Sequence, residues 1–219
     1  MNIKEIIEKV KEQNNVYKGP SQVALFLDKE QNLCFALIVN VRNLYIVNVY
    51  NEFLNILGYF HLSFFNEKVS YLDVIYTYHH LRGLGIGKQM SNLMDYILKS
   101  KDSNFVYGSY MPQQLSDDKR NDIYCSQEEL ENRAANFYTS TGFHFITAEN
   151  LKTCIEQFPE LNDQNLKAII NLEIEEKIVY KRVDKTKDCK YKDYGDVLIH
   201  EDVLKLKKEK VENIIKKSI

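Results

Sequence analysis

The stretch Tyr71–Lys88 reads YLDVIYTYHHLRGLGIGK and decides the fold. The run Ser70–Tyr78, which begins one residue before this stretch, consists mainly of aromatic and aliphatic residues and is typical of a β-strand. The run leads into a turn with three alternating glycines. From Ile86 onward, apolar residues recur with the spacing of an amphipathic helix. Glycines allow a tight turn and a close ligand, and N–H groups at a helix start attract anions. The stretch therefore predicts a strand, a phosphate-binding turn and a helix.

Two common phosphate-binding loops are excluded by single residues in this turn. The Walker pattern requires glycine at position 82 and serine or threonine at position 89, where the chain has Arg82 and Gln89. The dinucleotide pattern G-x-G-x-x-G requires glycine at position 88 or 90, where it has Lys88 and Met90. The ligand of this turn must therefore be sought in another family of phosphate-binding proteins.

The elements around the turn are expected to form one mixed sheet with helices. A short helix over Ile3–Lys11 precedes the strands, and polar turns between the strands predict an antiparallel meander. The expected meander strands are Val23–Leu27, Cys34–Val41, Leu44–Val49, Ile56–Phe65 and Ser70–Tyr78. After the central helix we expect strand Asn104–Tyr110, a loop over Met111–Cys125, a helix opened by a capping box at Ser126–Glu129, strand Phe143–Ala148, helix Asn162–Leu172, strand Glu176–Val183 and a Lys-rich helix over Val203–Ile215.

Two segments resemble signatures of the GNAT superfamily of N-acetyltransferases. Arg82-x-x-Gly85-x-Gly87 is similar to its pyrophosphate-binding motif, R/Q-x-x-G-x-G/A, which also follows a central strand and begins a helix. Glu131–Phe143, ENRAANFYTSTGF, is similar to its later helix, N-x-x-A-x-x-F-Y-x-x-x-G-F, with Glu131 in place of the frequent first Asn. The resemblance covers roughly residues 55–183. It implies an α/β (α+β) fold of the acyl-CoA N-acyltransferase type, with a mixed, mostly antiparallel central sheet flanked by helices.

The resemblance implies that acetyl-CoA (CoA) is the cofactor. The strand edge at Ile75, Tyr76 and Thr77 would bond the pantetheine arm, and Asn136 would replace the cofactor contact that Glu131 alters. Backbone N–H groups of the turn would hold the pyrophosphate, in a segment comprising Arg82, Gly83, Leu84, Gly85, Ile86, Gly87 and Lys88.

Acetyl transfer to an amine also requires a proton acceptor and a proton donor. By resemblance, Tyr138 is the candidate general acid, because a phenol can protonate the departing thiolate. Asp73 is the candidate base, since strand alternation places it on the same face as Ile75 and Thr77. Ser109 and Tyr110 are expected to line the acceptor pocket.

The leading interpretation is an N-acetyltransferase that moves an acetyl group to a primary amine by direct attack in a ternary complex. One alternative is a catalytically silent acyl-CoA-binding regulatory module. A second is an enzyme that acetylates aminoacyl-tRNA, as toxin relatives in the family do. The acceptor can be a small-molecule amine or a protein amine. The sequence also leaves open whether the protein forms a homodimer.

Composition narrows these alternatives. The chain has 219 residues, 44% hydrophobic and 27% charged, with a net charge of −2. Residues 181–219 hold 12 Lys and Arg against 8 Asp and Glu, so the remaining body is acidic and disfavours nucleic acid. We expect an acetyltransferase domain over residues 1–183 with an atypical N-terminal helix and hairpin, and a basic helical extension over residues 184–219 packed on or beside it. The four scattered cysteines predict free thiols in the cytoplasm and no metal site, and no apolar run predicts a membrane span or signal peptide.

Overall fold

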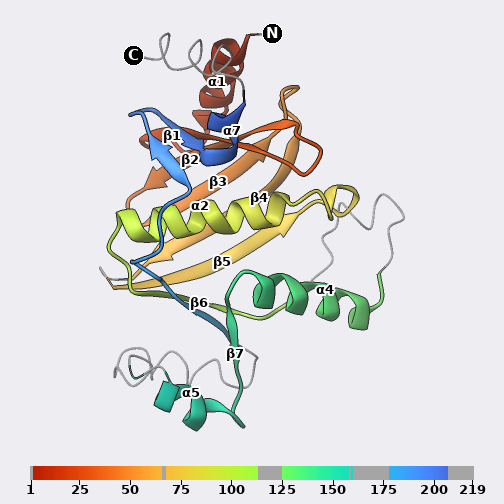
Figure 1. The fold of residues 1–219 in the computed structure, drawn as a ribbon, viewed down its shortest axis with the longest axis vertical. Coiled ribbons are helices and arrows are strands. Elements are labelled where there is room, and N and C mark those ends of the chain that lie inside the picture. The colour runs from red at the N-terminus through yellow and green to blue at the C-terminus, as the bar shows by residue number, and fades with distance from the viewer. Residues whose placement is uncertain (1, 66–67, 113–124, 158, 160–177, 207–219) are drawn as a thin grey trace.

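The computed structural model describes residues 2–65, 68–112, 125–157, 159 and 178–206. Within them the chain forms a mixed α/β fold whose sheet has ten strands in the order β7-β8-β6-β5-β4-β3-β2-β1-β10-β9. All neighbouring strands pair antiparallel except β1 with β10 and β5 with β6. The sheet is therefore mostly antiparallel and flanked by helices, as the sequence predicts (Figure 1).

The first five strands confirm the predicted meander. They are β1 (Ser21–Leu27), β2 (Leu33–Val41), β3 (Leu44–Tyr50), β4 (Ile56–Phe64) and β5 (Val69–Thr77). Both faces of β1 and β2 are covered, so these strands are continuous apolar runs rather than alternating ones. Along Gly58–Ser63 of β4 and Val69–Asp73 of β5, more exposed residues alternate with buried ones, which indicates that one face is less covered.

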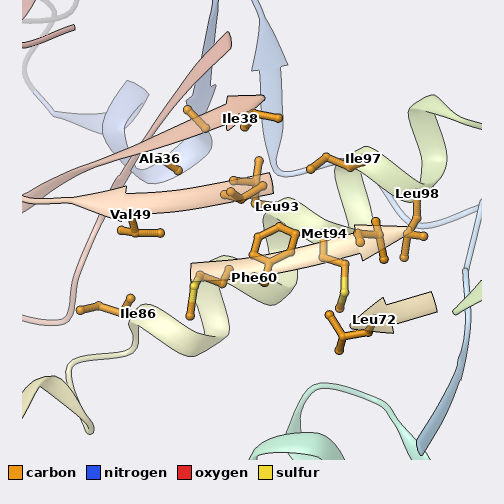
Figure 2. Packing of buried hydrophobic residues seen from close by; sticks show 14 of the residues in the cluster. Ala36, Ile38, Val49, Phe60, Leu72, Ile86, Leu93, Met94, Ile97 and Leu98 are labelled. Carbon is orange, nitrogen blue, oxygen red and sulfur yellow. The ribbon is translucent and has the colours of Figure 1, made fainter. Parts of the chain in front are cut away.

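Helix α2 (Ile86–Ser100) lies across one face of the sheet, over β4 and β5 (Figure 1). Its apolar stripe packs on side chains of the central strands. Figure 2 shows Leu93 and Met94 of α2 beside Phe60 of β4, with Leu72 of β5 close by. Phe60, Leu93 and Met94 are fully buried, so this cluster fixes the distance between α2 and the sheet.

The face of the sheet away from α2 is covered by helices at its two ends. Helix α1 (Ile3–Glu12) begins with a reciprocal capping box between Asn2 and Glu5, and packs on β1 and β2. At the other end, α5 (Leu151–Gln157) packs beside β6 (Phe105–Ser109), β7 (His144–Ile146) and β8 (Ile178–Arg182). Within the described residues, no helix is long and apolar enough to cross a membrane.

Helix α4 (Gln127–Ser140) begins and ends as local sequence requires, with one difference. Ser126 accepts the backbone N–H of Glu129 at 3.1 Å, but the Glu129 carboxylate pairs with Arg133, so only half of the predicted capping box is seen. Gly142 follows the helix at φ +86°, and the N–H of Phe143 donates to the carbonyl of Tyr138 at 2.9 Å. This left-handed glycine ends the helix in a Schellman arrangement.

The C-terminal segment needs a correction to the expected helical extension. Residues Tyr191–Asp193 and Val197–His200 are strands β9 and β10, and β10 pairs parallel with β1. Strands this short carry no readable period, and their partner is far away in the sequence. Helix α7 (Glu201–Lys205) then packs on β1. Most of the expected loop Met111–Cys125, the helix Asn162–Leu172 and residues 207–215 of the Lys-rich helix lie outside the described residues.

Candidate active site

The glycine turn connects β5 to α2 through the 3₁₀ segment η2 (His79–Leu81). Gly83 and Gly85 have φ values of +92° and +80°, which only glycine adopts at little cost. Gly85 is the N-cap of α2, and no described side chain caps that end. The first N–H groups of α2 are therefore left to a ligand or to water, and the helix dipole favours an anionic one.

Arg82 braces the strand end against this turn. Its Nε donates to the carbonyl of Thr77 at 3.2 Å, and its guanidinium carbon lies 5.7 Å from the centre of the Tyr76 ring. The Thr77 carbonyl is therefore already accepting a side-chain hydrogen bond. A carbonyl oxygen can accept two hydrogen bonds, so the predicted contact of Thr77 with the pantetheine arm would share this oxygen with Arg82 or use other atoms of Thr77.

Lys29, which the sequence did not indicate, lies over the glycine turn. Its backbone N–H donates to the carbonyl of Leu84 at 2.9 Å, and a Cβ added at Gly85 would lie 3.1 Å from its Cγ. Lys29, Lys88 and Lys190 border a hollow of about 250 Å³ beside the turn. Asp28 and Asp202 also line this hollow, so three lysines from three segments of the chain stand beside the turn together with two acidic residues. Lysines beside the start of α2 favour a phosphate-bearing ligand.

Strands β5 and β6 diverge well before β5 reaches the turn. Their parallel ladder joins Val69–Tyr71 to Phe105–Tyr107, and within the described residues no pairing between them continues beyond Tyr71. Gly108 lies at the fork, where a Cβ would come 2.8 Å from the carbonyl oxygen of Leu72. The segment that contains Ile75, Tyr76 and Thr77 pairs with β4 on one side and faces the opening on the other. An extended ligand could enter this opening by strand addition.

A bulge in β5 overturns the predicted placement of Asp73. Leu62 of β4 faces Leu72, the preceding His61 faces Val74, and Asp73 between them has no counterpart in β4. The extra residue reverses the alternation. Ile75 packs in the core under α2, whereas the Asp73 carboxylate accepts the Ser63 hydroxyl at 2.7 Å on the other face. Asp73 therefore does not share a face with Ile75.

Tyr138 packs among aromatic rings on the α2 side of the sheet. Its ring centre lies 5.9 Å from that of Tyr110 and 5.3 Å from that of Phe143. Burial, followed by the proximity of Tyr110 and Tyr71, raises the pKa of the Tyr138 hydroxyl to about 12. The hydroxyl is therefore protonated at neutral pH. A thiol of ordinary pKa is a stronger acid than this phenol, so donation of a hydrogen bond, rather than full proton transfer to the thiolate, is its main contribution.

The remaining predicted site residues are placed as follows. The hydroxyl of Ser109 lies at the fork between β5 and β6, 3.0 Å from the hydroxyl of its neighbour Tyr71. Tyr110 is buried, and its hydroxyl donates to the backbone carbonyl of Glu131 at 2.6 Å, so it supports α4 rather than opening onto an acceptor. Asn136 is exposed on α4, roughly 200° around the helix from Tyr138. It therefore lies away from the helix face that packs toward the sheet.

In the comparisons with known proteins, the chain matches solved structures but no sequence family. No family model and no curated protein sequence matches the chain. Among solved structures, a GNAT-family acetyltransferase from Staphylococcus aureus Mu50 is 20% identical, with 64% of this chain and 69% of that chain covered at a TM-score of 0.41. Tetrahymena GCN5 is 10% identical, with coverages of 68% and 73% and a TM-score of 0.41.

A third neighbour was solved with coenzyme A. The PaiA N-acetyltransferase of Thermoplasma acidophilum is 14% identical, with 64% of this chain and 61% of that chain covered at a TM-score of 0.40. The first and third of these neighbours are named as acetyltransferases. The assignment of an acetyltransferase function to this chain therefore depends on its own motifs and on the geometry of the turn, the fork and Tyr138.

Proposed function

We propose that the chain is an acetyl-CoA-dependent N-acetyltransferase of the GNAT type. The observation that carries the proposal is the fork between β5 and β6, which has the glycine turn at one end of β5 and Tyr138 of α4 packed nearby. One continuous site can therefore hold a phosphate, an extended arm and a reactive end. The two GNAT-like motifs of the sequence supply the turn and the tyrosine.

The residues present fit this cofactor. The uncapped N-terminus of α2, with left-handed Gly83 and Gly85, would hold the pyrophosphate, and Lys29 and Lys88 would add ionic attraction. The strand segment at Ile75 and Tyr76 would lie along the pantetheine arm. Bound acetyl-CoA supplies an activated acetyl group as a thioester.

The protein would contribute positioning and proton management. Holding the thioester in the fork next to a primary amine turns a bimolecular reaction into an effectively unimolecular one. The Tyr138 hydroxyl would donate a hydrogen bond to the sulfur as negative charge develops there. The acceptor is a primary amine on a small molecule or on a protein.

The testing experiment has two parts. Isothermal calorimetry measures binding of CoA and acetyl-CoA, and a thiol-release assay with acetyl-CoA screens an amine panel that includes polyamines, amino sugars, amino acids, lysine peptides and aminoacyl-tRNA. Binding together with amine-dependent thiol release is expected. Binding without thiol release for any amine would favour a silent acyl-CoA-binding module. Absence of binding would overturn the cofactor assignment itself.

A further inference from the structure

His61 lies on the face of the sheet opposite α2. Its neighbours in β4, Phe60 and Leu62, are both fully buried in the core under α2. Alternation along the strand therefore directs Tyr59, His61 and Ser63 to the other face. The Tyr59 and His61 rings lie 5.8 Å apart between centres, and His61 is partly buried. The imidazole thus lies next to the Tyr59 ring and remains partly accessible.

The bulge in β5 brings a carboxylate to the same face. Asp73 is the extra residue opposite the His61–Leu62 step, and its Oδ2 accepts the hydroxyl of Ser63, two residues beyond His61 in β4. Without the bulge, strict alternation would have put Asp73 beside Ile75, on the face under α2. The bulge therefore assembles a cluster of His61, Ser63 and Asp73 on the face opposite α2, over β4 and β5, and β5 borders the fork on its other edge.

The electrostatics of this cluster keep the imidazole neutral. Burial lowers the pKa of His61 below its ordinary value of 6.5, and the Asp73 charge opposes that shift without cancelling it. Across the ladders His61 faces Ile46 of β3 and Val74 of β5, which carry no charge, and its ring neighbour Tyr59 is a phenol. Among the described residues, Asp73 is the charged group that acts on His61.

We propose that His61 accepts the proton from the acceptor amine during acetyl transfer, and that Asp73, held by Ser63, is a positioning residue for that imidazole. This inference rests on the proposed acetyltransferase function. It replaces the sequence-based expectation that Asp73 itself is the base. An exposed carboxylate that already accepts the Ser63 hydroxyl is a weaker proton acceptor than a neutral imidazole at neutral pH.

The step balances with the groups named. The amine lone pair forms a bond to the acetyl carbonyl carbon, the carbon–sulfur bond breaks, and its electron pair leaves with the thiolate. The proton lost by the nitrogen goes to a ring nitrogen of His61. Tyr138 acts from the α2 side of the sheet and His61 from the other side, so donor and acceptor approach the fork from opposite faces. Solvent then removes the proton from His61.

Three single variants test the assignment. His61→Gln keeps a polar side chain of similar length but cannot accept the proton, and Asp73→Asn removes the charge while keeping the shape. His144→Gln is the matched control, because His144 of β7 is exposed and lies outside the site. For each variant, acetyl transfer to one amine is followed from about pH 5 to about pH 9, and acetyl-CoA binding is measured separately.

We expect His61→Gln to lower kcat by roughly 10²–10⁴-fold, with acetyl-CoA affinity unchanged. In the unmodified protein, kcat/KM should fall as the pH is lowered, and the pKa of this fall should equal the pKa that NMR titration gives for His61. Asp73→Asn should move both the kinetic limb and the NMR titration to lower pH, because the carboxylate raises the pKa of His61. Using one amine throughout keeps the contribution of its own ionisation constant.

The other possible results contradict either the role of His61 or the acetyltransferase function. Full activity in His61→Gln, or loss of activity in Asp73→Asn alone, overturns the His61 assignment while leaving the acetyltransferase function intact. If the unmodified protein transfers acetyl to no amine, the proposed function fails, and the role of His61 fails with it. If His61→Gln does not fold, the comparison of the kinetic and NMR pKa values in the unmodified protein and in Asp73→Asn decides, and a mismatch overturns the proposal.

Discussion

Gly87 of α2 and Phe137 of α4 are in direct contact: a Cβ added at Gly87 would lie 3.1 Å from Cε2 of the Phe137 ring. The contact joins the two sequence motifs in space. Phe137 immediately precedes Tyr138, so the start of α2 sets how closely the candidate acid approaches the glycine turn. Glycine at position 87 thus serves helix packing, in addition to any contact with a ligand.

Gly87→Val should destabilise the protein and impair catalysis together. Overpacking at this contact is expected to lower the free energy of unfolding by about 1–3 kcal/mol, and the displaced α4 should lower kcat. Urea unfolding and thiol release measure the two effects. Adding Phe137→Ala should recover part of the loss, with a coupling energy of about 0.5–3 kcal/mol. Strict additivity of the two changes would show that the contact is not the cause.

Gly85→Ala should weaken CoA binding more than its effect on folding explains. Gly195→Ala is the matched control, because Gly195 also has a positive φ, +82°, in a turn with open space around it. Each change is expected to cost about 1–2 kcal/mol of backbone strain. Only Gly85→Ala should lower CoA affinity in calorimetry, since its Cβ meets Lys29 and alters the N-terminus of α2. Equal affinities in the two variants would contradict the assigned phosphate site.

Lys29→Ala and Lys88→Ala should each raise the Kd for CoA by about two- to fivefold, the effect of an exposed charge pair. Each should also reduce the dependence of Kd on salt, because screening acts on the attraction that the variant removes. Lys152→Ala on α5 is the control and should bind as the unmodified protein does. Calorimetry at low and high salt checks the prediction, and salt-independent binding in the unmodified protein would argue against phosphate recognition.

Tyr138→Phe should lower kcat by roughly 10- to 100-fold while acetyl-CoA affinity changes little. The hydroxyl donates to a charge that exists only as the thiolate departs, and a hydrogen bond to a charged group contributes about 1.5–3 kcal/mol. Phenylalanine keeps the ring contacts with Tyr110 and Phe143, so unfolding by urea should be near normal. Normal turnover in this variant would assign Tyr138 to packing alone.

Stability should fall as the pH drops through the range in which His200 is protonated. The His200 side chain is buried, and its Nδ1 accepts the backbone N–H of Asp202 at 3.2 Å as the N-cap of α7. Burial lowers its pKa in the folded state below the ordinary 6.5. The stability that neutral His200 contributes is thus complete above about pH 6.5, and it is lost as the pH falls through the pKa of His200 in the folded state.

Urea unfolding at about pH 7.5 and about pH 5.5 measures this loss. His200→Asn keeps an N-capping side chain without the titration, so its stability should change less between the two pH values. The pKa of His61 is also lowered in the folded state, so part of the pH dependence of stability should persist in His200→Asn. An unchanged pH dependence in His200→Asn would contradict the role given to His200.

The sequence by itself determined the features that depend on neighbouring residues. The apolar spacing from Ile86 fixed α2, the polar turns separated the five meander strands, and Gly142 ended α4. Arg82, Gly85 and Gly87 indicated an anion-binding helix start because the conformational freedom of glycine and the helix dipole are local properties. The motif around Tyr138 also indicated which helix supplies the candidate acid.

Only the tertiary structure decided how distant segments meet. The bulge at Asp73 depends on the number of residues in the facing strand β4, which no periodicity within β5 reveals. It moved Asp73 away from Ile75 and brought it to the face of His61. The position of Lys29 over Gly85 and the pairing of β10 with β1 likewise follow from packing between segments far apart in the chain. The glycine turn could thus be predicted from sequence, whereas the proton acceptor required the register between two strands.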